Sequence, residues 1–185
     1  MDGTSRTRAV ATLADLYAFQ GRAELVGGEL IAMSATGFQP SRAGLTIAAS
    51  LREYERATHR GYAMPDNAAY VVELPGRSSF SPDASFYVGP PTGAKFMQGA
   101  PLFAAEVRSE GDYGPAAELR IATKREEYFA AGTRVVWDVD VLREGIVRVY
   151  ETERPHDPRT YRRGQRAEAE PALPGWSMAV DELLE

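Results

Sequence analysis

The spacing of hydrophobic residues divides the chain into short strands and helices. Strands are indicated where apolar and polar residues alternate, and helices where apolar residues recur at steps of three and four. We predict helices at residues 12–19, 41–59, 115–131 and 180–184, and strands at residues 22–26, 29–33, 62–64, 69–74, 83–88, 102–107, 134–141, 145–151 and 160–168. Residues 75–81 and 89–100 are rich in turn-forming residues and are expected to be connections.

Turn and capping residues support several of these boundaries. Thr12 and Ser41 stand where a helix N-cap is expected, because their hydroxyl groups can accept a hydrogen bond from the first helical turn. Pro115 and Gly132 bracket the third helix in the order typical of a helix start and stop. The pair Gly27-Gly28 separates two short strands, and this predicts a hairpin.

Three polar residues stand out in the middle of the chain. Asp83 follows a proline at the entrance of a strand. Glu106 interrupts a run that is otherwise apolar on both faces, as in a central, covered strand. Lys124 shares the inner stripe of the third helix with Tyr128. Burying such a carboxylate is costly unless it is paired or bound to a cation, so these positions are candidates for chemistry.

Pairing of the 83–88 and 102–107 strands beneath the third helix would bring two carboxylates and one ammonium group together. We therefore expect an α/β fold with a mixed central β-sheet, with these strands at its middle and the 41–59 and 115–131 helices flanking it. The length of 185 residues fits one domain over residues 1–185, with residues 1–10 as a flexible tail.

This set of groups suits hydrolysis of a phosphodiester bond. Two carboxylates bind Mg²⁺ or Mn²⁺ through hard oxygen ligands and leave coordination positions for water and a phosphate oxygen. The metal lowers the pKa of the water, and a lysine nearby orients the water or stabilises charge on the phosphate. The sequence thus predicts a metal-dependent nuclease site with Asp83 and Glu106 as metal ligands and Lys124 as their catalytic partner.

The order of these residues resembles a known family. The matching positions are Glu24-Leu25-Val26 with Gly28-Glu29-Leu30, Met33-Ser34 with Thr36-Gly37, Pro82-Asp83, Glu106-Val107 with Ser109, Asp112, Lys124, Tyr128, Ala131-Gly132 and Val136-Trp137 with Val139-Asp140. As an ordered set, from Leu13 to Tyr150, they are similar to the Uma-type putative restriction endonuclease family, a bacterial group within the PD-(D/E)xK nuclease superfamily.

The resemblance implies a restriction endonuclease-like fold and a Mg²⁺- or Mn²⁺-dependent endonuclease that acts on DNA. By position, it implies that Asp83 and Glu106 bind the metal and that Lys124 is the family's lysine from the following helix. Consistent with this, Arg108 and not a lysine occupies the third place of the strand motif.

Two further acidic residues are candidates for auxiliary roles. Glu24 matches a recurrent acidic residue of the family's first strand, and Asp112 lies close enough in sequence to assist. The chain departs from its relatives at Gln39-Pro40-Ser41, where they often carry a histidine, and at Val141, where they tend to carry a proline. The first departure removes any auxiliary role for that histidine, and the second concerns a turn.

The charge balance argues against a nucleic-acid ligand. The net charge is −5, whereas nonspecific affinity for nucleic acids comes largely from lysine and arginine contacts to phosphates. Arg52, Arg56 and Arg60 fall at helical spacing, and they form either a locally basic surface or an ordinary solvated face. The chain has no cysteine, and its imidazoles are those of His59 and His156, so a zinc site is not expected.

Other features bear on location and assembly. No stretch approaches the roughly 20 apolar residues that span a bilayer, and the N-terminus lacks a signal-peptide pattern, so we expect a cytoplasmic protein without a membrane partner. Cutting both strands of a duplex requires two sites, which favours a homodimer or higher homo-oligomer.

Each candidate also has a structural interpretation. Asp83 can serve a turn after its proline, Glu106 can form an ion pair with Arg108, and Lys124 can extend to solvent past the sheet. Asp112 fits a turn-organising role, and without the resemblance Glu24 is an ordinary surface residue of a strand. In the same way, Asp138 and Asp140 are expected on a solvated strand face. The alternative function is a catalytically inactive nuclease-fold module that binds nucleic acid or protein.

Overall fold

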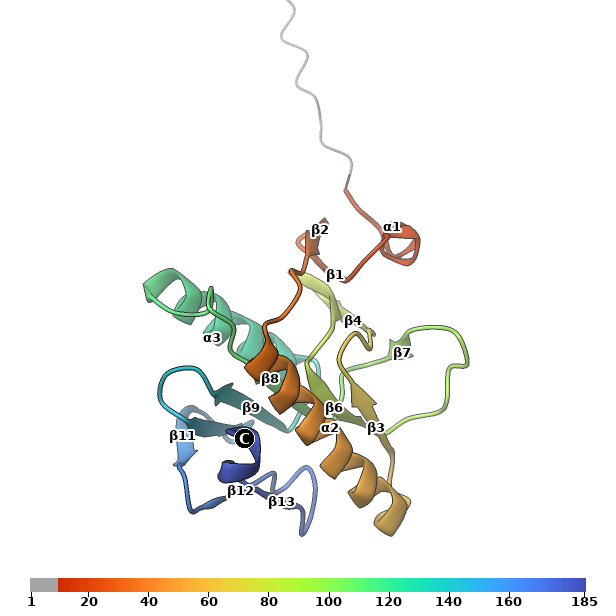
Figure 1. Ribbon diagram of the computed structural model, residues 1–185. Coiled ribbons are helices and arrows are strands. Elements are labelled where there is room, and N and C mark those ends of the chain that lie inside the picture. The colour runs from red at the N-terminus through yellow and green to blue at the C-terminus, as the bar shows by residue number, and fades with distance from the viewer. Residues whose placement is uncertain (1–9) are drawn as a thin grey trace, which may run out of the picture.

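The computed structural model describes residues 10–185 (Figure 1). In chain order the elements are α1 (Leu13–Ala18), β1 (Ala23–Val26), β2 (Glu29–Ala32), α2 (Phe38–Thr58), β3 (Tyr62–Pro65), β4 (Tyr70–Leu74), β5 (Arg77–Phe80), β6 (Ala84–Tyr87), β7 (Met97–Gln98), β8 (Phe103–Val107), α3 (Pro115–Ala130), β9 (Val135–Asp140), β10 (Ile146–Glu151), β11 (Arg154–Tyr161), β12 (Arg166–Glu168), β13 (Ser177–Ala179) and the 3₁₀ helix η1 (Val180–Leu183). The predicted tail, apart from Val10, lies outside the described residues.

Two mixed sheets form the frame of the fold. The larger sheet has the strand order β11-β10-β9-β8-β6-β3, with β8 and β9 parallel and the other neighbours antiparallel. A five-stranded sheet has the order β2-β1-β5-β4-β7, and β12 pairs separately with β13. β6 and β8 lie inside the larger sheet, between β9 and β3. The predicted α/β architecture, a mixed sheet flanked by helices, is confirmed.

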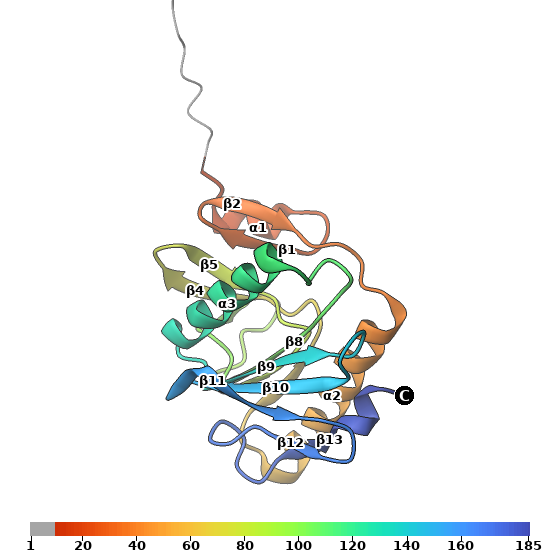
Figure 2. The ribbon, with the colours of Figure 1, turned by 90° about the vertical axis from the view of Figure 1, so that its left-hand side faces the viewer.

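One face of the six-stranded sheet packs against α2 and the C-terminal segment. Figure 2 shows β12 and β13 on one side of this sheet and α3 on the other. Alternate residues of β6, β8 and β9 meet the apolar stripe of α2, because residues two apart in a strand point to the same face. The largest members of this core are Ile47, Leu51, Phe86, Phe103, Trp137, Leu173 and Trp176. Each such side chain contributes roughly 1.5–3 kcal/mol when it is buried.

The opposite face points toward α3 and the five-stranded sheet. A second core fills this space, and it consists of Tyr70, Val72, Phe80, Tyr87, Met97, Ala104, Tyr128 and Val136. Glu106 lies two residues beyond Ala104 on β8, so their side chains point to the same face. Asp83 lies four residues before Tyr87 along β6 and the residue that precedes it, so the Asp83 carboxylate points to this face as well. The fold therefore places them between the two sheets.

Several local predictions are confirmed, and one boundary is wrong. Thr12 caps α1 through a capping box with Asp15, and Gly27-Gly28 turn the β1–β2 hairpin with φ of 57° and 75°. In contrast, α2 begins at Phe38, and the Ser41 hydroxyl donates to the Thr36 carbonyl at 3.3 Å instead of capping the helix.

The strands differ from the prediction in several places. β7 lies in the expected connection at residues 89–100, β13 was not predicted, and the expected strand at residues 160–168 is divided between β11 and β12. The expected connection at residues 75–81 contains β5, which pairs with both β1 and β4. Its serines obscure the strand pattern, yet the Ser79 hydroxyl accepts the backbone N–H of Leu25 at 2.8 Å. β11 begins earlier than residue 160 and contains Pro155 and Pro158, which it tolerates because it forms the edge of its sheet.

Among residues 10–185, no helix combines the length and the apolar character that crossing a lipid bilayer requires.

Candidate active site

Glu106, the next-to-last residue of β8, contacts two side chains of α3. The Lys124 ammonium lies 2.9 Å from its carboxylate, and the Tyr128 hydroxyl donates to Oε1 at 2.7 Å. The Tyr128 ring is fully buried and stacks on Phe80 with ring centroids 4.0 Å apart, which holds the hydroxyl in place. Lys124 and Tyr128 are four residues apart and therefore share one face of the helix.

Lys124 also reaches the other sheet. Its ammonium lies 2.9 Å from Oε1 of Glu24 on β1, so one lysine bridges the five-stranded and six-stranded sheets. Glu24 is 6% exposed and also accepts hydrogen bonds from Arg77 at 2.6 Å and from the Ser81 backbone N–H at 2.8 Å. Lys124 thus does not extend to solvent, and the surface interpretation of Glu24 is wrong.

Asp83 is tied to the end of β8 by its own carboxylate. Its Oδ2 accepts the backbone N–H of Val107, the residue after Glu106, at 2.7 Å. Arg22 approaches Oδ1 at 3.3 Å, and the same guanidinium pairs with Asp66 at 2.6 Å. The structure therefore brings Asp83, Glu106 and Lys124 to one place, as the sequence predicted, with Glu24 beside them.

Burial raises the pKa values of the three carboxyls, and neighbouring cations lower them. Burial, with Asp83 and Glu24 nearby, raises the pKa of Glu106 to about 7 against the attraction of Lys124. Burial also raises the pKa of Asp83, because the Val107 N–H and Arg22 compensate only in part. For Glu24, burial is outweighed by Lys124 and Arg77, and its pKa falls below the usual range.

The two α3 side chains remain protonated. Burial opposes the charge on Lys124, but Glu106 and Glu24 outweigh it and raise the pKa of the ammonium. Burial and the adjacent Glu106 carboxylate raise the pKa of the Tyr128 hydroxyl well above its ordinary value. Both groups therefore act as hydrogen-bond donors at neutral pH.

Asp112 lies in the connection between β8 and α3. Its Oδ2 accepts the Ser109 backbone N–H at 2.8 Å, which closes the turn before the helix. Within residues 10–185 no hydrogen bond or ion pair joins it to Glu106 or Lys124. The turn-organising interpretation matches this contact, and an auxiliary role stays a prediction.

Arg108 does not pair with Glu106. It forms a bidentate ion pair with Asp138, at 2.6 and 2.7 Å, and it also binds Glu118. Asp138 and Asp140 are 3% and 1% exposed, so their expected position on a solvated face is wrong. The covering helix α3 and the connection before it bury this face, which strand alternation alone cannot reveal.

Sequence reasoning missed two arginines of the site. Arg22 stands two residues before Glu24, and this spacing on an extended segment is a signal that the two share a face. Arg77, which binds Glu24 and also Glu127 at 2.6 Å, had no signal, because β5 itself was not recognised.

The donor set fits a hard divalent cation. No group of three or more His, Cys, Asp or Glu side chains in the described part of the chain has the arrangement of a metal centre. Magnesium, however, commonly binds one or two protein carboxylates and completes its shell with water and substrate phosphate. Asp83 and Glu106 supply such oxygens, and burial raises the pKa of both carboxyls. A bound cation would favour their charged forms.

Comparisons with known proteins agree with this fold. A crystal structure of a putative nuclease belonging to DUF820, from Anabaena variabilis, is similar with a TM-score of 0.74 at 15% identity, over 94% of this chain and 97% of that chain. This supports the restriction endonuclease-like fold. No curated protein matches the chain. The model of the Uma2 family, described as "Putative restriction endonuclease", matches residues 11–181. Because that match covers most of the sequence, the chain belongs to the Uma2 family of putative restriction endonucleases.

Proposed function

We propose that this chain is a Mg²⁺- or Mn²⁺-dependent endonuclease that hydrolyses phosphodiester bonds of DNA at Asp83, Glu106 and Lys124. The observation that carries the proposal is the convergence of these groups from three elements. Lys124 contacts the Glu106 carboxylate, and Asp83 binds the backbone of the residue that follows Glu106. Membership of a nuclease family supports the same chemistry.

Asp83 and Glu106 would hold the metal ion. A bound Mg²⁺ or Mn²⁺ supplies Lewis acidity, which polarises the phosphate and lowers the pKa of a water molecule. The hydrogen bond from Val107 to Asp83 and the one from Tyr128 to Glu106 orient the two carboxylates before any ligand arrives. Such preorganisation lowers the cost of assembling the site.

Lys124 acts as a cation and hydrogen-bond donor. Because Glu106 and Glu24 raise its pKa, the ammonium does not accept a proton from water at neutral pH. It instead positions the attacking water and stabilises negative charge that develops on the phosphate. Glu24 is a positioning residue in this scheme, since it lies 2.9 Å from the ammonium and holds it from the five-stranded sheet.

The proposal includes a two-fold symmetric homodimer. One site cuts one strand, and cutting both antiparallel strands of a duplex requires two sites related by a two-fold axis. Light scattering coupled to size exclusion, with and without DNA, measures the assembly directly.

The first test is calorimetric titration of Mn²⁺ into the wild type and into Asp83→Asn and Glu106→Gln. We expect binding in the wild type and its loss in both variants, because each removes a charged ligand oxygen. Glu126→Gln is the matched control, since Glu126 is an exposed carboxylate on α3 only two residues from Lys124. Its titration should match the wild type.

Cleavage of supercoiled plasmid with Mn²⁺ completes the test. Nicking by the wild type that disappears in Asp83→Asn, Glu106→Gln and Lys124→Met supports the proposal. Binding of Mn²⁺ that persists in both carboxylate variants contradicts the assigned ligands. A wild type that binds Mn²⁺ and DNA without cleaving would instead support the inactive nuclease-fold module.

A further inference from the structure

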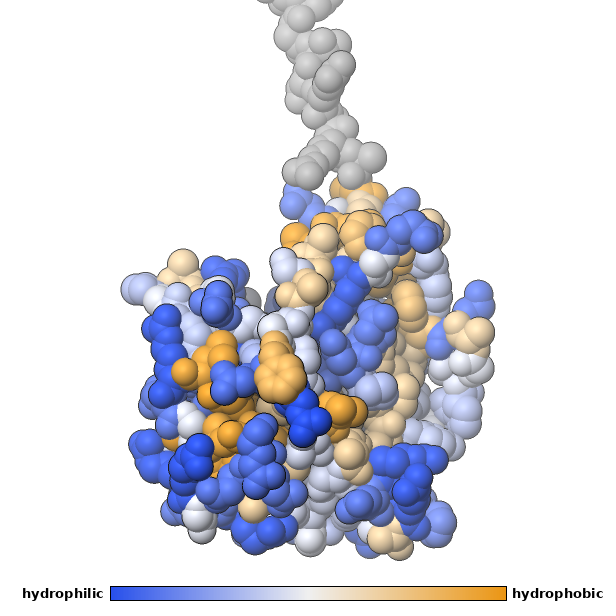
Figure 3. Space-filling model, viewed as in Figure 1, coloured by the Kyte–Doolittle hydropathy of each residue, from blue (hydrophilic) through white to orange (hydrophobic). Residues whose placement is uncertain are grey.

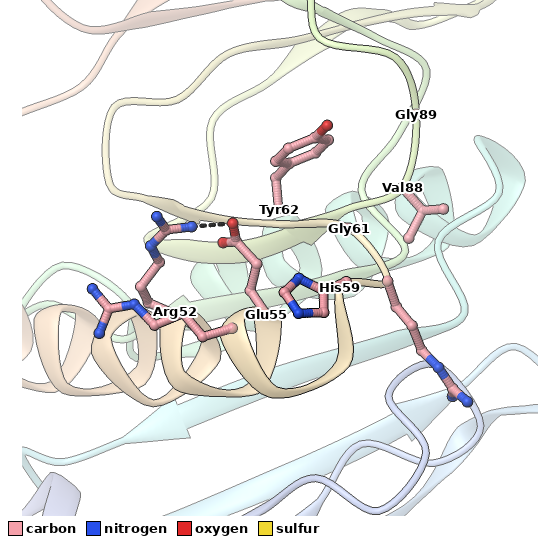
Figure 4. A pocket seen from close by; sticks show the side chains of 9 residues that line it. Arg52, Glu55, His59, Gly61, Tyr62, Val88 and Gly89 are labelled. Carbon is pink, nitrogen blue, oxygen red and sulfur yellow. Dashed lines mark hydrogen bonds and ion pairs between the residues drawn. The ribbon is translucent and has the colours of Figure 1, made fainter.

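A groove opens at the C-terminal end of α2, away from the carboxylates. Figure 4 shows it between the last turns of α2, the start of β3 and the segment after β6. The hollow has a volume of about 560 Å³. Its principal side chains are Arg52, Glu55, Arg56, His59, Arg60 and Tyr62.

The groove carries more positive than negative charge, because three arginines face one carboxylate. Its one carboxylate, Glu55, accepts the Ala63 backbone N–H at 2.8 Å and is paired with Arg52. Arg56 and Arg60 are exposed, and within residues 10–185 neither side chain forms a hydrogen bond or a close ion pair, although the Glu55 carboxylate also attracts Arg56. Two guanidinium groups therefore face solvent in one hollow of a chain whose net charge is −5.

The electrostatics of the helix end account for only part of this charge. The partial negative charge at a helix C-terminus favours cations within the last turn. Arg56 lies in that turn, whereas Arg52 precedes it and Arg60 follows the end of the helix at Thr58. Clustered arginines on one face are the electrostatic footprint expected of a nucleic-acid contact. A guanidinium also matches the bidentate geometry of phosphate.

Two elements lead from the groove to the candidate active site. Val88 lines the groove five residues after Asp83, which is about 17 Å along β6. On α2, Gly44 lies against Asp83, because a Cβ added there would be 3.5 Å from the Asp83 carbonyl oxygen. Arg56 follows Gly44 by twelve residues, or about 18 Å of helix. One DNA strand covers that distance in about five nucleotides.

The surface between the two places is mixed. In Figure 3, hydrophilic residues gather at the lower end of α2, whereas its upper end carries apolar residues, with Phe38 and Leu45 78% and 61% exposed. The edge strand β3 connects the groove to the candidate site, with Tyr62 in the groove at its start and Asp66 just beyond its end. Asp66 in turn holds the guanidinium of Arg22 that contacts Asp83.

We propose that this groove binds backbone phosphates of the DNA substrate about five nucleotides from the cleaved bond. The assignment of the DNA to a substrate rests on the proposed nuclease function. Arg56 and Arg60 contact the phosphates, and the Tyr62 ring, 40% exposed, forms a wall of the groove. The groove thereby attracts DNA to a chain whose overall charge repels it.

The test measures binding of a fluorescent duplex of about 30 base pairs over a series of salt concentrations, in EDTA and again with Ca²⁺. Arg56→Gln and Arg60→Gln should each weaken binding, and each should reduce the slope of log K against log salt by about 1. The double variant should reduce it by about 2. Both side chains are exposed, so the variants should fold.

Arg163→Gln is the matched control. It makes the same change of charge at a side chain that is 69% exposed, between β11 and β12. Its slope should equal that of the wild type. A double variant with the wild-type slope overturns the inference, and so does an equal loss in Arg163→Gln.

Plasmid cleavage by the same preparations separates the two proposals. If the wild type cleaves DNA and the arginine variants keep the wild-type salt slope, the phosphate-binding groove is refuted and the nuclease proposal stands. If the slopes of the arginine variants fall as expected but the wild type never cleaves, the phosphate-binding groove is supported and the nuclease proposal is refuted. A wild type that binds no DNA overturns both.

Discussion

Replacing Lys124 by methionine removes the cation between two buried carboxylates. The ammonium lies 2.9 Å from Glu24 and 2.9 Å from Glu106, and the lysine side chain is 18% exposed. Methionine keeps a similar volume but no charge. Both carboxylates would keep other hydrogen bonds, to Arg77 and to Tyr128.

The expected loss follows from the geometry. At 2.9 Å each pair has an attraction of about 6 kcal/mol with an effective dielectric constant of about 20. Desolvation of the ammonium offsets most of this, and breaking a buried pair typically costs about 3–5 kcal/mol. We therefore expect the free energy of unfolding of Lys124→Met to fall by about 3–5 kcal/mol at about pH 8.

The loss should depend on pH because Glu106 titrates. Its pKa of about 7 lies above the ordinary value of 4.5, so the folded state favours the protonated form. The stability that this group contributes is therefore present below pH 4.5 and is lost as the pH rises through about 7. At about pH 6 the carboxyl is largely neutral and the pair with Lys124 is already weakened, so the loss should be roughly half as large.

Urea denaturation followed by circular dichroism, in EDTA, measures both values. Adding Glu106→Gln to Lys124→Met should recover about half of the loss at about pH 8, because it removes the carboxylate left without its cation. Arg120→Met, at an exposed position of α3, should change stability by less than about 0.5 kcal/mol. A loss below about 1 kcal/mol at both pH values, or an equal loss at both, would refute the reasoning.

Two further predictions concern the surrounding structure. Arg108→Met should lower the free energy of unfolding by about 3–5 kcal/mol in urea titrations, because it leaves Asp138 buried without its bidentate partner, and adding Asp138→Leu should recover most of it. Gly61→Ala should cost about 1–3 kcal/mol in thermal unfolding, since its Cβ would lie 2.5 Å from the Tyr87 carbonyl oxygen. Gly111→Ala meets open space and should unfold like the wild type, so equal losses at the two glycines would contradict the clash.

Local elements of the fold were predictable from neighbouring residues alone. The Gly27-Gly28 hairpin, the cap at Thr12 and the span between Pro115 and Gly132 depend on hydrogen bonds and φ angles within a few positions. β5 was missed because it has no such local signal. Its serines carry no alternating apolar signal, and its pairing with β1 joins segments about fifty residues apart.

In the candidate site, the residues were predictable from the sequence, but their contacts were not. Glu106 and Lys124 were chosen as polar residues at positions whose surroundings predicted burial, and Asp83 as a residue that follows a proline at a strand entrance, and all three match the resembled family. Their contacts, by contrast, include two residues that were not predicted to take part, Arg22 and Arg77. Arg22 lies 61 positions from Asp83, and the pattern on either strand says nothing about which side chain arrives from the other.

The sequence by itself thus determined the element types, most of their boundaries and the identity of the chemically unusual residues, because these depend on spacing along the chain. Only the tertiary structure decided which charges meet. The placement of α3 over the sheet buried Asp138, and the approach of the second sheet put Glu24 against Lys124. Those outcomes depend on the packing of elements distant in sequence. Such packing decides burial and charge pairing at the same time, and the spacing of residues along one element does not reveal it.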